Sequence, residues 1–170
     1  PSSSTTAQIS FGDALAISTI NQRKFSKLDF RKFHPSGSLG KRLKTVGELM
    51  YKGKNIPFIN ENSHIREALK VFNKKNLGVL VARNKKGITT GIISDGDFKR
   101  INKNLVNIDN LIVKKVRKKN PIVVDKDMLA AEALSIMNNK KITALCVFNK
   151  NSRKTIGLIH VHNILDANIT

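Results

Sequence analysis

The last three quarters of the chain contain two similar sequence segments, about 65 residues apart. Glu67-Ala68-Leu69 aligns with Glu132-Ala133-Leu134, 65 positions later, and Gly91-Ile92-Ile93 aligns with Gly157-Leu158-Ile159 after one inserted residue. A solenoid needs at least about three units to bury its faces. Two copies therefore predict a pseudo-symmetric pair of units packed face to face, with a cleft along the seam. We expect the functional site to lie in that cleft.

The composition is typical of a soluble globular protein. Of 170 residues, 40% are hydrophobic and 25% are charged. No apolar run approaches the roughly 18 residues of a membrane span, and the N-terminus lacks the basic start and apolar stretch of a signal peptide. Cys146 has no second cysteine to pair with and lies in an apolar run, so we expect a buried strand residue. These features predict a cytoplasmic protein with no membrane association.

The formal net charge of +19 raises the question of nucleic-acid binding. Lysine supplies 23 of the 31 basic residues, there is no Trp, and there is one Tyr. Bidentate arginine contacts and aromatic stacking platforms are therefore scarce. The lysines are also scattered through both halves. We expect no nucleic-acid partner, and we interpret the basic run 114–119 as a solvated connection between the halves.

Each repeat has the pattern β-α-β-β-α. The first is predicted to contain a strand in 55–60, a helix whose N-cap is Ser63, two strands joined by a turn at 83–87, and a helix that opens at Asp95. The second is predicted to contain a strand at 121–125, a helix over 129–137, two strands, and a last helix that runs to Asn168. The fold class is α/β (α+β).

Residues 1–45 belong to neither repeat. Apolar residues at helical spacing predict a helix over 11–23, and the Gly, Pro and Ser residues of 33–40 predict a loop. One helix and one loop cannot build a core of their own. We expect this segment to be a remnant of an earlier domain.

The stretch Gly91–Phe98, GIISDGDF, carries a family resemblance. In its repeat context it resembles the ligand-contacting segment of the tandem cystathionine-β-synthase (CBS) domain pair, a regulatory module that often binds adenosine nucleotides. The resemblance implies CBS domains at 46–108 and 109–170. It also implies that Ser94 contacts phosphate at a strand-to-helix turn and that Asp97 accepts bonds from ribose hydroxyls. The alternative is a turn hydroxyl and a helix cap with no ligand.

The second copy departs from this pattern. His160 replaces the hydroxyl and Asn163 replaces the carboxylate, so a second ribose-type site is not expected. His160 is a candidate ligand contact or a packing residue of the cleft. His160 and His162 would share one strand face, but no third metal ligand is evident, and we predict no metal site.

The order of an N-terminal segment, a His-Pro-x-Gly loop and a CBS pair resembles the C-terminal half of bacterial arabinose-5-phosphate isomerases. Members of that family join a sugar-isomerase (SIS) domain to two CBS domains, and interconvert ribulose 5-phosphate and arabinose 5-phosphate on the way to the Kdo sugar of lipopolysaccharide. The resemblance implies a SIS remnant at 1–45 and an active-site His34. It further implies a sugar-phosphate substrate, no required cofactor, an adenine-nucleotide or CMP-sugar effector, and a homo-oligomer, either dimer or tetramer.

Aldose–ketose isomerisation needs a base and an acid near the reacting carbons. His34 could shuttle protons, but no Glu precedes Glu48 and the only earlier carboxylates are Asp13 and Asp29. We therefore expect this 170-residue chain alone to be inactive. The alternative is a stand-alone nucleotide-sensing CBS module that regulates a separate partner.

Overall fold

The chain forms two units, residues 1–43 and residues 44–170. The computed structural model describes residues 2–26, 29–30, 33, 43–103, 110–149 and 152–169. In the first unit, helix α1 (Ser3–Gln22) buries none of its residues. Ile9, Phe11 and Leu15 are among its exposed apolar side chains. None of the helices in the described ranges is long and apolar enough to cross a membrane.

The second unit contains the two predicted repeats. The first repeat consists of β2 (Phe58–Asn60), α5 (Ile65–Lys75), β3 (Val79–Arg83), β4 (Thr89–Ser94) and α6 (Asp95–Lys103). The second consists of β5 (Val123–Val124), α8 (Ala130–Lys140), β6 (Ala144–Phe148), β7 (Thr155–His160) and α9 (Val161–Leu165). Short elements precede each repeat: α4 (Val46–Leu49), β1 (Tyr51–Lys52) and the 3-10 turn Gly53–Asn55 before the first, and α7 (Val113–Val116) before the second.

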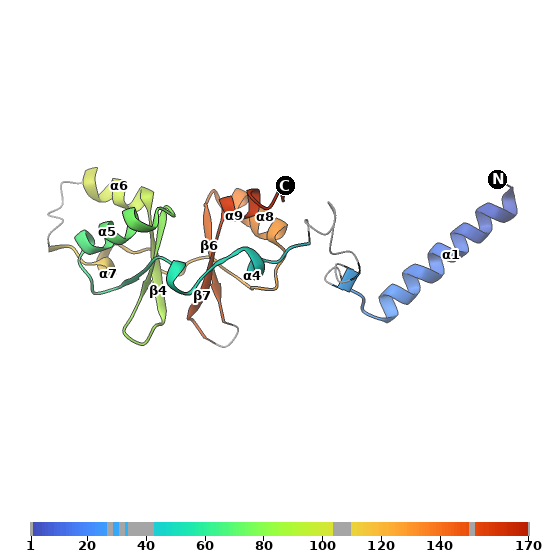
Figure 1. The fold of residues 1–170 in the computed structure, drawn as a ribbon, viewed down its shortest axis with the longest axis horizontal. Coiled ribbons are helices and arrows are strands. Elements are labelled where there is room, and N and C mark those ends of the chain that lie inside the picture. Colours follow the sequence, from blue (N-terminus) through green and yellow to red (C-terminus); the bar gives the residue numbers. More distant parts are fainter. Residues whose placement is uncertain are drawn as a thin grey trace. The chain divides into compact units, whose positions relative to one another are not determined.

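The strands form two sheets with the same internal order. In one sheet β2 pairs parallel with β3, which pairs antiparallel with β4. In the other, β5 pairs parallel with β6, which pairs antiparallel with β7. The β3–β4 hairpin and the β6–β7 hairpin lie side by side (Figure 1), and the hydroxyls of Thr89 and Thr155 meet at 2.7 Å.

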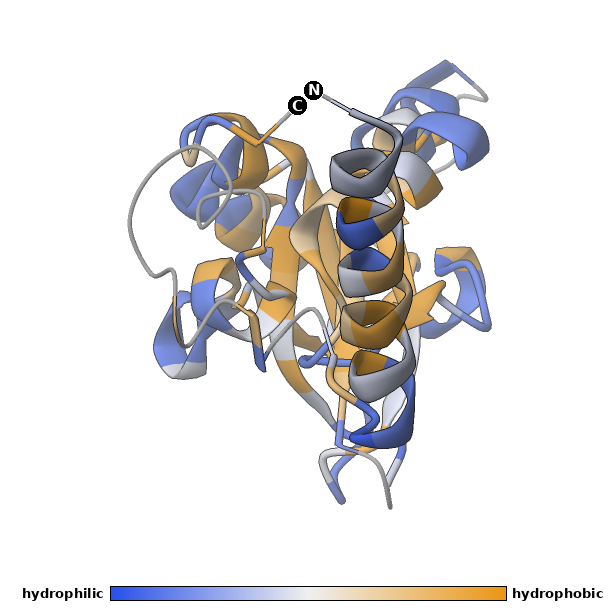
Figure 2. Cartoon of the chain, turned by 90° about the vertical axis from the view of Figure 1, so that its right-hand side faces the viewer, coloured by the Kyte–Doolittle hydropathy of each residue, from blue (hydrophilic) through white to orange (hydrophobic). Residues whose placement is uncertain are grey.

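Apolar residues fill three clusters. One lies between the two sheets and includes Val79, Val81, Cys146 and Leu158. The others lie between each sheet and the helices on its outer side. In Figure 2 the strands are mostly of hydrophobic colour, whereas the helices carry both hydrophobic and hydrophilic residues. Cys146 is 2% exposed, as predicted for a buried strand residue.

The short elements cross over between the repeats. Val46 of α4 packs in the core of the second repeat, and β1 pairs with β7, the last strand of that repeat. In the same way Val113 of α7 packs in the core of the first repeat, and Lys118 pairs with Ile92 of β4. Each repeat therefore completes its core with a segment that precedes the other. The internal repeat in the sequence did not predict this exchange.

Two predicted helix ends differ from the structure. The N-cap of α5 is His64 rather than Ser63, because His64 pairs with Ile112 and so keeps the chain extended for one more residue. Helix α9 ends at Leu165 rather than at Asn168. The chain turns there because Ile169 is fully buried in the core of the second repeat.

Candidate functional site

A cavity of about 420 Å³ lies at the seam of the two repeats. Its walls come from β3, from the β4–α6 turn, from the segment that follows α7, and from the start of β6. The lining residues are Gly78, Val79, Ile92, Ser94, Asp95, Gly96, Lys118, Lys119, Asn120, Pro121, Ile122, Lys141, Ile142, Thr143 and Ala144. The cavity combines an apolar wall with a helix N-terminus and three lysines. This is a surface suited to an anionic ligand that carries an apolar ring.

The β4–α6 turn is held by Asp97. Its Oδ2 accepts a hydrogen bond from the backbone N–H of Ser94 at 2.8 Å and a second one from the Ser94 hydroxyl. Its Oδ1 pairs with Arg100 and lies 3.5 Å from Nζ of Lys118. The Asp97 carboxylate and two cations thus lie together at the N-terminal half of α6.

Electrostatics keep Asp97 ionised. Burial alone would raise the pKa of its carboxyl group, but the hydrogen bonds from Ser94 and Arg100 and the charge of Lys118 outweigh burial. The net result is a pKa below the ordinary aspartate value. Asp97 is therefore a carboxylate at neutral pH.

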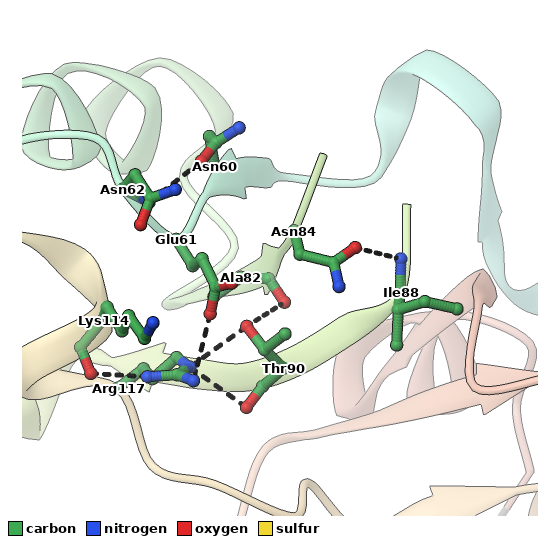
Figure 3. Close-up of polar contacts among 9 residues, drawn as sticks. All are labelled: Asn60, Glu61, Asn62, Ala82, Asn84, Ile88, Thr90, Lys114 and Arg117. Atoms are coloured by element: carbon green, nitrogen blue, oxygen red, sulfur yellow. Dashed lines mark hydrogen bonds and ion pairs between the residues drawn. The ribbon is translucent and has the colours of Figure 1, made fainter. Parts of the chain in front are cut away.

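Arg117, which precedes Lys118 in the chain, bonds to Glu61, Thr90 and Lys114 (Figure 3). Its Nη2 pairs with Oε2 of Glu61 at 3.0 Å, and both side chains are nearly buried, with 8% and 12% exposed. Its Nε donates to the carbonyl and the hydroxyl oxygens of Thr90, and its Nη1 donates to the carbonyl oxygen of Lys114. The interpretation of the run 114–119 as a solvated connection is wrong at Arg117, whose side chain is nearly buried and paired with Glu61.

Glycine permits the close approach of this wall. A Cβ on Gly91 would overlap the backbone carbonyl oxygen of Lys118. At the equivalent place in the second repeat, a Cβ on Gly157 would overlap the side chain of Met50. Gly91 and Gly157 have no side chain, and this leaves room for Lys118 and Met50, which belong to the chain segments that cross over between the repeats.

The site residues that were predicted from the sequence lie in different places. Ser94 lines the cavity, whereas Asp97 is not among the described lining residues and touches the site through Ser94 and Lys118. The predicted catalytic His34 lies outside the described residues. Sequence reasoning missed the lysines of the cavity. Lys118 and Lys119 belong to the basic run, but nothing in the local pattern around Lys141 marks it.

The equivalent turn of the second repeat is built differently. The N–H of His160 donates to Oδ1 of Asn163 at 2.9 Å, and Nδ1 of His160 accepts from the N–H of His162 at 3.3 Å. His160 does not line the cavity described above, and burial, helped by the charge of His162, lowers its pKa. In the described part of the chain, no three His, Cys, Asp or Glu residues are grouped so as to hold a metal ion.

Known proteins are similar to this chain in sequence. The CBS-domain sequence model matches residues 46–103 and 113–169. Arabinose 5-phosphate isomerase KdsD of Escherichia coli K12 is 35% identical over 170 residues, which cover 99% of this chain and 51% of that protein. The Yersinia pestis KdsD is 33% identical with the same coverage. The chain thus spans about half the length of the curated relatives it matches.

Solved structures match the described repeats. CBSX2 in complex with AMP has a TM-score of 0.65 and 21% identity, and the match covers 74% of this chain and 96% of that one. The CBS domain pair of protein MJ0100, in complex with 5′-methylthioadenosine and S-adenosyl-L-methionine, has a TM-score of 0.63 and 20% identity, with 72% and 98% coverage. These matches confirm the predicted fold, a mixed α and β tandem pair with pseudo-twofold symmetry.

Proposed function

Since the chain belongs to the CBS-domain family, we propose that the cleft between its two repeats binds a nucleotide-type effector. The observation that carries the proposal is the lining of one cavity by Ser94 and by Lys118, Lys119 and Lys141. Solved CBS pairs of the same fold hold AMP, 5′-methylthioadenosine and S-adenosyl-L-methionine. An adenine nucleotide is therefore the first candidate, and a CMP-sugar is the second.

The cavity offers each part of such a ligand a matching surface. The N-terminus of α6 lies where phosphate oxygens would accept hydrogen bonds, and the lysines add positive charge. The Ser94 hydroxyl, which donates to Asp97 in this structure, would turn to the phosphate when the ligand binds. Val79, Ile92 and Ile142 provide an apolar wall for a base. In this proposal Ser94 contacts the phosphate and Asp97 accepts hydrogen bonds from the ribose hydroxyls. His160, on the equivalent turn of the second repeat, stays a prediction.

Thermal unfolding with a panel of AMP, ADP, ATP and CMP-sugars tests this proposal. A ligand at 100 times its dissociation constant should add about 2.7 kcal/mol to the free energy of unfolding, a shift of several degrees. Ser94→Ala should reduce that shift, whereas Ser152→Ala, in the turn between β6 and β7, should not. The absence of a shift with every nucleotide would reject an effector role for the cleft.

We further propose that the chain is the regulatory portion of an arabinose-5-phosphate isomerase-like enzyme of lipopolysaccharide biosynthesis. Support comes from the 33–35% identity to KdsD proteins over 99% of this chain. In this proposal residues 1–45 are the remnant of a SIS domain, His34 is an active-site acid or base that acts on a sugar phosphate, and no cofactor is required. The protein would be a cytoplasmic homo-oligomer, and residues 46–108 and 109–170 would be its two CBS domains.

Activity measurements separate this proposal from a stand-alone sensor module. The 170-residue chain should not convert ribulose 5-phosphate, because the only carboxylates before Glu48 are Asp13 and Asp29. In a longer parent protein, His34→Ala should lower turnover by roughly 10²- to 10⁴-fold, the range of a positioned acid or base. If the reading frame upstream of Pro1 lacks a Ser-Gly-rich phosphosugar loop and paired glutamates, the sensor module is the better proposal.

A further inference from the structure

A second cavity, of about 510 Å³, shares no described lining residue with the cavity at the seam of the repeats. Its walls come from the 3-10 turn Gly53–Asn55, from β2, from the second half of α5 and from the end of β3. The volume is within the range of small-molecule sites. This cavity belongs to the first repeat, and the proposed function does not use it.

Three cations line this second cavity, those of Lys54, Lys75 and Arg83. Cζ of Arg83 lies 4.3 Å from the centroid of the Phe58 ring, and Nζ of Lys75 donates to the backbone carbonyl oxygen of Lys54. These contacts orient two of the charges but neutralise neither, because a ring and a carbonyl group carry no net charge. Within the described ranges, no carboxylate forms an ion pair with any of the three cations. The cavity therefore presents three uncompensated positive charges.

The other side chains of this cavity are apolar. Ile56, Phe58 and Val71 line it, and none of its described lining side chains has a hydrogen-bond acceptor. Sugar hydroxyls and the amino group of a base would therefore find no side-chain oxygen to which they could donate. A polar group that leaves water without a new partner loses binding energy. The cavity thus suits an anion whose organic part is apolar.

The fold does not need the arginine at this position. Arg83 ends β3 and pairs with the first residue of β4, just as Phe148 ends β6 and pairs with the first residue of β7. By the same strand register, Val123 of β5 occupies the place of Phe58. The second repeat therefore forms the equivalent strands without a charge. The stacked arginine and its ring occur together in the first repeat, where they line the cavity.

We propose that this second cavity binds a small organic dianion with an apolar body, such as an aryl phosphate or an aryl dicarboxylate. The Arg83 guanidinium, held against Phe58, binds two oxygens of one anionic group, the geometry in which arginine recognises phosphate and carboxylate. Lys54 and Lys75 attract the second negative charge, and the apolar lining covers the ring of the ligand. The site does not depend on nucleotide binding at the seam.

Amide nitrogen–proton correlation spectra of the 170-residue chain test the inference with four probes: phenyl phosphate, isophthalate, benzoate and inorganic phosphate. The titrations are made at about 50 mM salt, where the charges of exposed side chains are only partly screened. At least one of the two aryl dianions should shift the amides of Gly53, Lys75 and Arg83, with a dissociation constant of about 1 mM or less. Benzoate has one charge and inorganic phosphate has no apolar body, so each should bind at least about fivefold more weakly.

Substitutions with matched controls assign the binding to this cavity. Arg83→Gln and Lys75→Gln should each weaken binding of the dianion by about tenfold, and the same spectra show that each variant is folded. Lys140→Gln is the control for Lys75, because each lysine is the last residue of its helix before a left-handed C-cap. Lys86→Gln removes an exposed lysine of the turn that follows Arg83. Neither control residue lines the cavity, and both variants should bind like the wild type. Equal losses in all four variants would reduce the effect to net charge and overturn the inference.

The position of the shifted amides separates this inference from the proposed function. Shifts that are confined to Ser94, Gly96 and Lys141 would place the dianions in the cavity at the seam and overturn the inference. The absence of shifts with both aryl dianions at about 10 mM would also overturn it. Neither result affects the nucleotide proposal, which has its own thermal test. Conversely, shifts at Gly53 and Arg83 would support this inference even if every nucleotide failed to bind.

Discussion

Gly91 and Gly157 show how one residue type meets two different surroundings. Both stand in the last strand of a repeat, where the segment from the other repeat crosses. The neighbour of Gly91 is the backbone carbonyl of Lys118, whereas the neighbour of Gly157 is the flexible side chain of Met50. A methyl group can displace a methionine side chain far more easily than a hydrogen-bonded backbone.

Substitution of these glycines should therefore have unequal effects. Gly91→Ala is expected to lower the free energy of unfolding by about 2–3 kcal/mol, near the upper end of overpacking costs. Gly157→Ala should lower it by about 1 kcal/mol or less, because Met50 can adopt another rotamer. Urea denaturation of the two variants measures the difference. Equal losses would contradict the distinction between a backbone and a side-chain neighbour.

His160 predicts a dependence of stability on pH. Burial, first, and the charge of His162, second, lower the pKa of its imidazole in the folded state. The folded state therefore disfavours the protonated form, so the contribution of His160 is fully present above the unfolded pKa of about 6.5 and is lost as the pH falls through the folded value. Protonation would also remove the Nδ1 acceptor for the N–H of His162.

We expect stability to fall between pH 7 and pH 5.5 in the wild type, and to fall less in His160→Ser, which copies the hydroxyl of Ser94. Urea denaturation at several pH values gives the slope for each protein. Identical slopes would show that His160 does not contribute to the loss of stability in acid. That loss would then come from other titratable groups.

At the scale of the elements, the ion pair of Arg117 and Glu61 attaches α7 to the first repeat. Arg117 also bonds to both oxygens of Thr90 on β4, so one guanidinium ties three segments together. The residue at the equivalent position of the other crossing segment is Met50, which has no charge to bury. The fold thus accommodates either an ion pair or an apolar side chain at this position.

A double-mutant cycle tests the pair. Arg117→Met should lower the free energy of unfolding by about 3–5 kcal/mol, because it leaves the Glu61 carboxylate buried without its partner. Adding Glu61→Gln should recover a large part of that loss, since the remaining amide carries no charge. Additive losses in the double variant would mean that the two side chains do not interact.

At the scale of the whole molecule, the described hydrophobic clusters lie within residues 44–170. These clusters are built by the strands and helices of the two repeats and by α4 and α7. Helix α1 contributes no buried residue. The two repeats therefore carry the material of a complete folding unit.

Removal of residues 1–42 should leave this unit folded. The midpoint of thermal unfolding should change by less than about 2 °C, because a loss of even 1 kcal/mol would shift a domain of this size by a few degrees. Scanning calorimetry of the shortened and the full chains makes the comparison. Loss of the cooperative transition on truncation would show that the first unit supports the second.

The sequence by itself determined the repeated β-α-β-β-α pattern, since strands and helices leave local periods of apolar residues, and glycines and polar residues mark the turns between them. It also located Ser94 at the strand-to-helix turn, because that turn is a local motif. The exchange of α4 and α7 between the repeats was decided by tertiary structure. Each is a short helix, and its pattern of apolar residues does not indicate which of the two cores it packs against.

The charge of the cleft was likewise decided only by the tertiary structure. Lys118 and Lys141 lie far apart in the chain and look like ordinary solvated lysines, and only the packing of the two repeats brings them to one cavity. The burial of Arg117 needed its partner Glu61, which is 56 positions earlier in the sequence. A local sequence pattern reflects only residues that are close in the chain. The electrostatic interaction between two charged groups depends on their distance in space.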